Sequence, residues 1–185
     1  MSKYGGTYKG KKKTQDNYPV KIISRPKKPE PKPITLMFYM NQLNHENFEK
    51  ILEKIKEFDL ESEETAQIIY NRISQEKHFH DIYMKLISEN DKLFQNFLTL
   101  CDNLKNREVA EFLGKLYCTR EFDIEKYINI LIIQIFEEKK IEFVELLCKL
   151  LMPNKKKLDV KSYSEKLKSL SLVGRYKFMI MDLMD

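Results

Sequence analysis

Lysine and arginine are the residues of this chain with the clearest capacity for chemistry, and they are concentrated near the N-terminus. Residues 1–34 hold ten of them against two acidic residues, a net charge of +8, and three tyrosines are interleaved with these charges. Ammonium groups neutralise phosphates, and aromatic rings stack on bases. The segment is interpreted either as a basic arm that contacts RNA or as a solubilising tail or localisation signal. Its candidate RNA-binding residues are Lys9, Lys11, Lys12, Lys13, Arg25, Lys27 and Lys28.

A second basic cluster lies near the C-terminus, in the stretch "PNKKKLD" at residues 153–159. It supplies Lys155, Lys156 and Lys157 as further candidate RNA-binding residues. The sequence after residue 34 has 23 basic and 26 acidic residues, a net charge of −3, so this loop is basic on an otherwise acidic body. Phosphate binding and plain solvation both remain open for it.

Catalytic and cofactor-binding motifs are absent from the sequence. The stretch "GKKKTQ" lacks the spacing of a phosphate loop, and neither the three histidines nor the three cysteines stand at the spacing of a catalytic or zinc motif. The acidic pairs Glu63/Glu64 and Glu137/Glu138 are interpreted as helix-end charges. We therefore expect a protein that is not an enzyme and that binds no metal and no cofactor.

The cysteines and the apolar segments indicate a soluble protein of a reducing compartment. Cys101, Cys118 and Cys148 each lie in an apolar helical context, which favours buried reduced thiols over a disulfide framework or a metal site. The most apolar stretch, residues 127–136, is too short to span a membrane, and the first residues lack the apolar core of a secretory signal. We expect a cytoplasmic protein without membrane contact.

The residues after 34 are predicted to form helices throughout. Of the six prolines, five lie before residue 34, and the apolar residues of the remainder recur with helical spacing. Residues 1–34, rich in Gly, Lys and Pro, are expected to be disordered. The ten predicted helices cover residues 36–43, 45–58, 62–77, 79–87, 91–106, 107–119, 124–139, 141–152, 159–170 and 174–183.

Short connections between helices of this length are typical of antiparallel helix pairs. Either a closed bundle or a solenoid of stacked pairs would satisfy the pattern. We favour an all-α protein in which residues 36–185 form a right-handed α-solenoid of about five HEAT-like helix pairs, preceded by the disordered arm.

Three apolar residues surround the predicted break at Asn44, namely Met40, Leu43 and Phe48. The first pair of a solenoid has no neighbour on one side, so we expect these residues to cluster at an exposed end. Such residues either close the core or contact a partner.

Five segments, in collinear order, resemble the middle domain of eukaryotic translation initiation factor 4 gamma. The similarity covers about residues 36–185 and agrees with the count of five helix pairs. The segments are "MNQLNHENFEKILEKIKEFDLESEE", "AQIIYNRISQEKHFHDIYMKLI", "EVAEFLGKLYCTREFDIEKYINILI", "IEFVELLCKLLMPNKKKLD" and "GRYKFMIMDLMD".

This resemblance implies a translation-initiation scaffold that binds RNA and a DEAD-box RNA helicase of the initiation factor 4A type, and that stimulates the helicase. Residue by residue, it places helicase-binding positions at Met40, Leu43 and Phe48, and at Arg175, Lys177 and Phe178 near the C-terminus. The implied protein is a cytoplasmic monomer with mRNA and other initiation factors as further partners.

Two alternatives remain open from the sequence. Related helical domains occur in mRNA splicing, nonsense-mediated decay and nuclear cap binding, so the chain could be an adaptor in one of these pathways. A direct RNA-binding module, driven by the basic arm, is an alternative of a different class.

Overall fold

The computed structural model describes residues 35–44, 46–170 and 172–184. These residues belong to one unit, Ile34–Asp185. The predicted arm lies outside the described residues, as do its candidate RNA-binding residues Lys9, Lys11, Lys12, Lys13, Arg25, Lys27 and Lys28.

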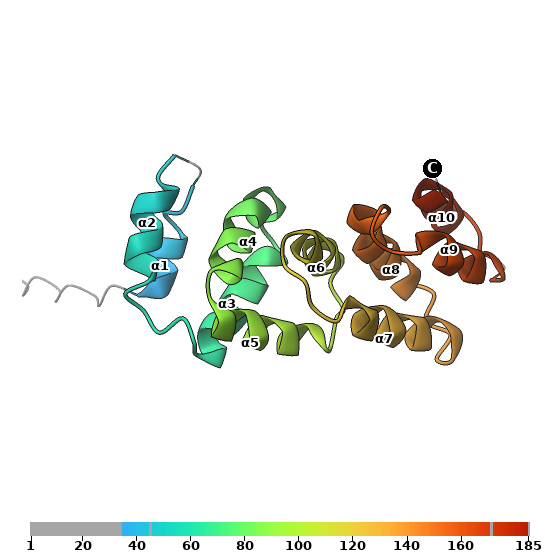
Figure 1. The fold of residues 1–185 in the computed structure, drawn as a ribbon, viewed down its shortest axis with the longest axis horizontal. Coiled ribbons are helices and arrows are strands. Elements are labelled where there is room, and N and C mark those ends of the chain that lie inside the picture. The colour runs from blue at the N-terminus through green and yellow to red at the C-terminus, as the bar shows by residue number, and fades with distance from the viewer. Residues whose placement is uncertain (1–34, 45, 171, 185) are drawn as a thin grey trace, which may run out of the picture. The chain divides into compact units, whose positions relative to one another are not determined.

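The described residues form ten α-helices, two 3-10 turns and no strand, so the predicted all-α class is confirmed for this part of the chain (Figure 1). The elements are α1 (Leu36–Met40), α2 (Phe48–Ile55), α3 (Glu63–Ile73), η1 (Lys77–Phe79), α4 (His80–Ser88), α5 (Asp91–Cys101), α6 (Arg107–Thr119), α7 (Ile124–Phe136), α8 (Phe143–Leu151), η2 (Met152–Asn154), α9 (Val160–Lys168) and α10 (Arg175–Met184).

Polar side chains fix where most of these helices begin. The residue before the helix accepts a hydrogen bond, through its side-chain oxygen, from a backbone N–H group of the first turn. That N–H group would otherwise lack a partner. At the last helix the chain instead turns through Gly174, whose φ of 61° suits a residue without a Cβ. The capping residues are Thr35, Ser62, Asn90, Asn106, Asp123 and Asp159, before α1, α3, α5, α6, α7 and α9.

The second helix begins later than the sequence predicts. The side-chain oxygen of Asn44 accepts hydrogen bonds from the backbone N–H groups of Glu46 and Asn47, both at 3.0 Å. The side chain of Asn47 in turn accepts from the N–H of Asn44 at 2.8 Å. These reciprocal bonds hold the chain in a turn, so α2 starts at Phe48 rather than directly after Asn44.

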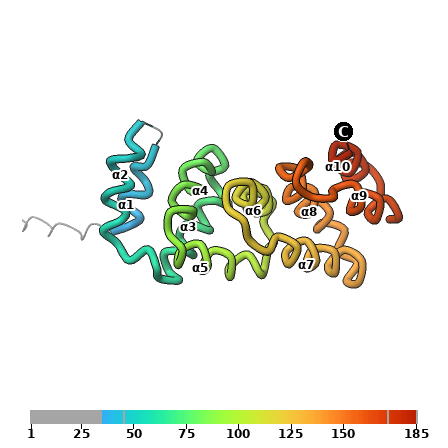
Figure 2. The backbone as a smooth tube through the Cα atoms, in the orientation of Figure 1, coloured from blue at the N-terminus to red at the C-terminus, as the bar shows by residue number. Residues whose placement is uncertain are grey.

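The helices pack in an alternating order along the chain. Helix α4 packs against α6, α6 against α8, and α8 against α10. Helix α3 packs against α5, and the hydroxyl of Tyr127 on α7 donates to the backbone oxygen of Leu98 on α5 at 3.0 Å. Figure 2 shows α4, α6, α8 and α10 following one another, with α5 and α7 below them. Helices α3, α4, α5, α6 and α8 therefore each contact the helix two places further along.

Of the two interpretations of Met40 and Leu43, their burial supports closure of the core. Met40 is 2% exposed and Leu43 is 5% exposed. Helix α1 packs against α2, so both side chains join a core that also contains Leu52 and Ile55. The first helix pair thus covers Met40 and Leu43.

The cysteines divide into two kinds. Cys101 and Cys148 are buried as predicted, and burial raises the pKa of the Cys148 thiol to about 12. Cys118, however, is exposed, which corrects the expectation for this residue. It lies near the end of α6, where its thiol donates to the side-chain oxygen of Asn154 at 3.0 Å. No helix formed by the described residues is long and apolar enough to cross a membrane.

Candidate functional site

Charged side chains from η1, α6, α8 and α10 meet on one surface, which we call the α6–α8 ion-pair surface. On α6, Glu108, Glu111 and Lys115 follow one another at helical spacing and so share a face. Opposite-charge pairs connect this face to η1, α8 and α10. The surface consists of Lys77, Arg107, Glu108, Glu111, Lys115, Glu145, Lys149 and Arg175.

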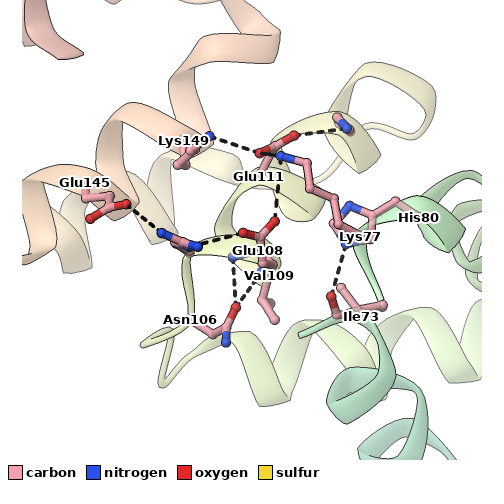
Figure 3. Close-up of polar contacts among 11 residues, drawn as sticks. Ile73, Lys77, His80, Asn106, Glu108, Val109, Glu111, Glu145 and Lys149 are labelled. Atoms are coloured by element: carbon pink, nitrogen blue, oxygen red, sulfur yellow. Dashed lines mark hydrogen bonds and ion pairs between the residues drawn. The ribbon is translucent and has the colours of Figure 1, made fainter. Parts of the chain in front are cut away.

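Glu111 is the centre of the first branch of this surface. Its carboxylate accepts from the ammonium groups of Lys77 at 2.6 Å, Lys115 at 3.1 Å and Lys149 at 3.2 Å. Figure 3 shows Lys149 and Lys77 approaching Glu111 from different segments. The three lysines come from η1, α6 and α8, so one carboxylate ties three elements together.

The second branch runs from Glu108 to the last helix. Glu108 pairs with Lys77 at 3.7 Å and with Arg107 at 3.1 Å. Arg107 also reaches Glu145 on α8 at 3.6 Å, and Glu145 pairs with Arg175 on α10 at 3.1 Å. The predicted partner-binding residue Arg175 is thus already engaged by the protein itself.

The acids of this surface are more buried than the bases. The side chain of Glu111 is 13% exposed, whereas those of its three lysine partners are a third to a half exposed. Although burial opposes ionisation of Glu111, the hydrogen bonds from Lys77, Lys115 and Lys149 lower its pKa to about 2. The carboxylate is therefore ionised at neutral pH, and the surface as a whole presents five basic groups against three acidic ones.

His80 lies beneath this surface as a buried neutral group. It is 2% exposed, its Nε2 is 3.0 Å from the backbone oxygen of Ile73, and its ring packs edge-on against Phe112. Figure 3 shows the contact with Ile73 beside Lys77. Burial lowers the pKa of His80, with a further contribution from Lys115. The geometry assigns the proton to Nε2, which donates to Ile73.

Helices α6 and α8 approach most closely beside the lysines. A Cβ atom at Gly114 would lie 2.4 Å from the backbone oxygen of Leu150. The side-chain amide of Asn154, which is buried, donates to the backbone oxygens of Gly114 at 2.8 Å and Leu150 at 3.2 Å. Lys115 and Lys149 directly neighbour this contact in sequence, so a backbone junction determines the spacing of their helices.

A cavity of about 510 Å³ adjoins the junction. Both charged and apolar residues line it. Its lining comprises Lys77, Glu111, Lys115, Cys148, Lys149, Met152, Pro153, Met179 and Asp182. No sequence motif indicated this cavity, because its residues lie on separate helices.

The predicted helicase-binding residues at the N-terminal end are not brought together on the surface. Met40 and Leu43 are buried, and Phe48 is half-buried with the Lys85 ammonium 4.6 Å from its ring centroid. The exposed apolar residues of α1 are Met37 and Phe38, the latter 46% exposed. The sequence prediction missed both, although their offset from Leu36 and Met40 places them on the opposite face of α1.

The three predicted residues of α10 point to different surroundings. Arg175 pairs with Glu145, whereas Lys177 lines a groove of about 280 Å³ between α9 and α10. Phe178 is 65% exposed. Three exposed apolar residues near it were not predicted, namely Val173, Met181 and Met184.

The lysines of the loop after α8 lie where α9 and α10 add further basic residues. Lys155 donates to the backbone oxygen of Asp182, and Lys157 donates to that of Cys118 at 3.1 Å, while Lys156 is exposed. Residues 152–185 contain eight basic and four acidic residues, a net charge of +4. Residues 35–151 contain 15 basic and 22 acidic residues, a net charge of −7. The two parts of the helical unit thus carry opposite charge.

Within the described ranges, no group of three or more His, Cys, Asp or Glu side chains is placed to hold a metal ion. Comparison with family models, with curated proteins and with solved structures found no match to this chain. The function must therefore be argued from the sequence resemblance and from the geometry of these surfaces.

Proposed function

We propose that this chain is a non-enzymatic translation-initiation scaffold of the cytoplasm, which binds a DEAD-box RNA helicase of the initiation factor 4A type together with RNA. The observation that carries the proposal is the alternating packing of α4, α6, α8 and α10. Stacked helix pairs of a HEAT-like, right-handed solenoid pack in this way. The five segments that resemble the initiation-factor domain follow this helix order.

Two separated apolar surfaces support a partner with two lobes. One is formed by Met37 and Phe38 on α1, and the other by Phe178 and Met181 on α10. Exposed apolar residues at two ends of a helical unit suit a partner that is contacted at two places. A scaffold of this kind stimulates a helicase when it binds the closed state more tightly than the open one, and a tenfold shift of that equilibrium needs about 1.4 kcal/mol of preference.

The test measures stimulation of a purified helicase of this type by the full chain. Phe38→Ala and Phe178→Ala, singly and together, should weaken helicase capture and reduce the stimulation of its RNA-dependent ATPase activity. Lys92→Glu on α5 serves as the control, because Lys92 is exposed and forms part of neither apolar surface. Unchanged stimulation by the double variant, with cooperative melting retained, would contradict the proposal.

Substitutions at Met40 and Leu43 test folding rather than partner binding. Because both side chains are buried, Leu43→Asp should unfold the first helix pair rather than abolish binding selectively. Phe48→Ala tests partner binding instead, since the ring of Phe48 is only half-buried.

A direct RNA-binding module is the second candidate function, and the net charge of +8 on residues 1–34 favours it. Deletion of residues 1–34 distinguishes the two. Under the RNA-module hypothesis this deletion removes nearly all RNA affinity and flattens its salt dependence, whereas helicase stimulation under the scaffold hypothesis persists. Identification of the proteins captured from native extract then separates translation initiation from splicing, decay or nuclear cap binding.

A further inference from the structure

The cavity between α6, α8 and α10 has unused hydrogen-bond donors. Lys115 and Lys149 each contact Glu111, and each ammonium group carries three N–H donors. Lys77 contacts Glu111 and Glu108. All three lysines are among the residues that line this space of about 510 Å³.

The charge of this space favours an anion. Three of its lining residues are lysines and two, Glu111 and Asp182, are acidic. The Glu111 carboxylate binds all three lysines at once, which holds them together despite their mutual repulsion. An anion that enters the cavity would therefore meet donors that are already positioned.

The rigidity of the neighbouring backbone maintains this arrangement. The contact between Gly114 and Leu150 determines the spacing of α6 and α8 at the residues next to Lys115 and Lys149. Asn154 bonds to both backbone oxygens of this contact. The site is built on helices rather than on loops, which is the more precise support for a binding site.

The surroundings indicate a chain of phosphates rather than one isolated anion. Lys155 donates to the backbone oxygen of Asp182, a residue of the cavity lining, and so extends the positive charge to the next loop. Met152 and Met179 give the cavity an apolar wall on which a ribose or a base can pack. Phosphates at regular intervals with apolar groups between them are the chemistry of single-stranded RNA.

We propose that this cavity binds a backbone phosphate of single-stranded RNA, with Lys77, Lys115 and Lys149 as donors and Glu111 as the internal carboxylate that positions them. The proposal rests on the RNA-binding part of the proposed function and assigns it a site outside residues 1–34. Glu111 has a double role, because it orders the lysines and also competes with the phosphate for their charge.

Because of this double role, substitution of the lysines and substitution of Glu111 should change the RNA affinity in opposite directions. The affinity of the full chain for a fluorescein-labelled decauridylate is measured by anisotropy at about 50 mM salt and upward. Lys115→Gln combined with Lys149→Gln should weaken binding about three- to tenfold and reduce the slope of log K against log salt by about 1.4. Glu111→Gln, whose amide oxygen still accepts from the lysines, should strengthen binding several-fold.

A matched control carries the same loss of charge at another place. Lys126→Gln with Lys140→Gln also removes two ion-paired lysines, whose partners are Asp102 and Glu138. Equal effects of the two double variants would overturn the site, as would weaker RNA binding by Glu111→Gln. Thermal melting of each variant identifies any that fail to fold, and Glu111→Gln then decides the matter alone.

Three further outcomes separate this proposal from the alternatives. A wild-type chain that binds no decauridylate removes both the site and the RNA-binding part of the proposed function. Wild-type binding that is unchanged in the cavity variants removes only the site. If polyglutamate of equal charge displaces the RNA with equal potency from the wild type, and not from the double lysine variant, the occupant is an acidic polypeptide and the assignment to RNA is wrong.

Discussion

At the scale of single residues, Gly114 shows most directly how the sequence limits this structure. Any larger residue would bring its Cβ to 2.4 Å from the Leu150 oxygen, and backbone atoms cannot move aside as a flexible side chain can. We expect Gly114→Ala to lower the free energy of unfolding by about 1–3 kcal/mol. Urea denaturation measures this, with Thr119→Ala, at the exposed end of the same helix, as a control that changes it by about 0.5 kcal/mol or less.

The buried His80 predicts a pH dependence of stability. Burial lowers its pKa in the folded state, so below its ordinary pKa of about 6.5 the unfolded state binds a proton that the folded state does not. Stability is therefore complete above this pH and decreases as the pH falls below it. The charged groups near the ring are Lys115, Glu108 and Glu111, and the lowered carboxyl pKa of Glu111 affects stability below about pH 4.5.

The urea midpoint of the wild type should accordingly fall between pH 7 and pH 5.5. His80→Gln keeps an amide donor for Ile73 but does not titrate, so its midpoint should fall less over the same interval. His78→Gln is the matched control, because His78 is exposed, and it should retain the wild-type dependence. Equal pH dependence of the wild type and His80→Gln would show that another group is responsible.

At the scale of elements, the start of α6 supports the whole ion-pair surface. The side-chain oxygen of Asn106 accepts from the backbone N–H groups of Glu108 at 2.8 Å and Val109 at 3.2 Å (Figure 3). Asn106→Ala should cost about 1 kcal/mol of stability in thermal or urea unfolding, whereas Asn106→Ser, which can also cap, should cost much less. An equal loss in both variants would mean that the cap contributes little.

The helices themselves could largely be predicted from the sequence, because their apolar spacing and their caps are local. Helix α6 covers the predicted residues 107–119, and α7 begins after its predicted cap Asp123. The start of α2 could not be predicted in this way, since Asn44 and Asn47 both offer capping oxygens. In the structure each side chain accepts a hydrogen bond from the backbone N–H of the other residue. A local sequence pattern does not predict where a helix begins when two neighbouring residues can both cap it.

The sites were much less predictable than the helices, because they depend on contacts between elements. Met40 and Leu43 are apolar whether they meet a partner or α2, so sequence alone could not assign their exposure. Lys77 and Lys149 lie 34 and 38 residues from Glu111, and no local pattern records such a pairing. Phe178 was predicted through the resemblance as a helicase-binding residue. Because it is exposed, substitution of its side chain can test this prediction.

At the scale of the whole helical unit, charge predicts where RNA should be found. Residues 152–185 carry a net charge of +4 and residues 35–151 a net charge of −7. Ultraviolet crosslinking of oligouridylate to the full chain, followed by mass spectrometry, should therefore place adducts in residues 149–184 and in residues 1–34, and not in residues 48–73. Adducts concentrated on α2 and α3 would contradict this prediction.

The separation of charge between α1–α5 and α9–α10 has a consequence before any contact forms. A body that is negative towards one end and positive towards the other has an electric dipole, and the field of a polyanion exerts a torque on it. A helical unit without residues 1–34 therefore approaches RNA with α9 and α10 leading, while the acidic end is turned away. A strand held by the leading end leaves the Met37–Phe38 surface free for a second macromolecule, and rising salt shortens the range over which this orientation acts.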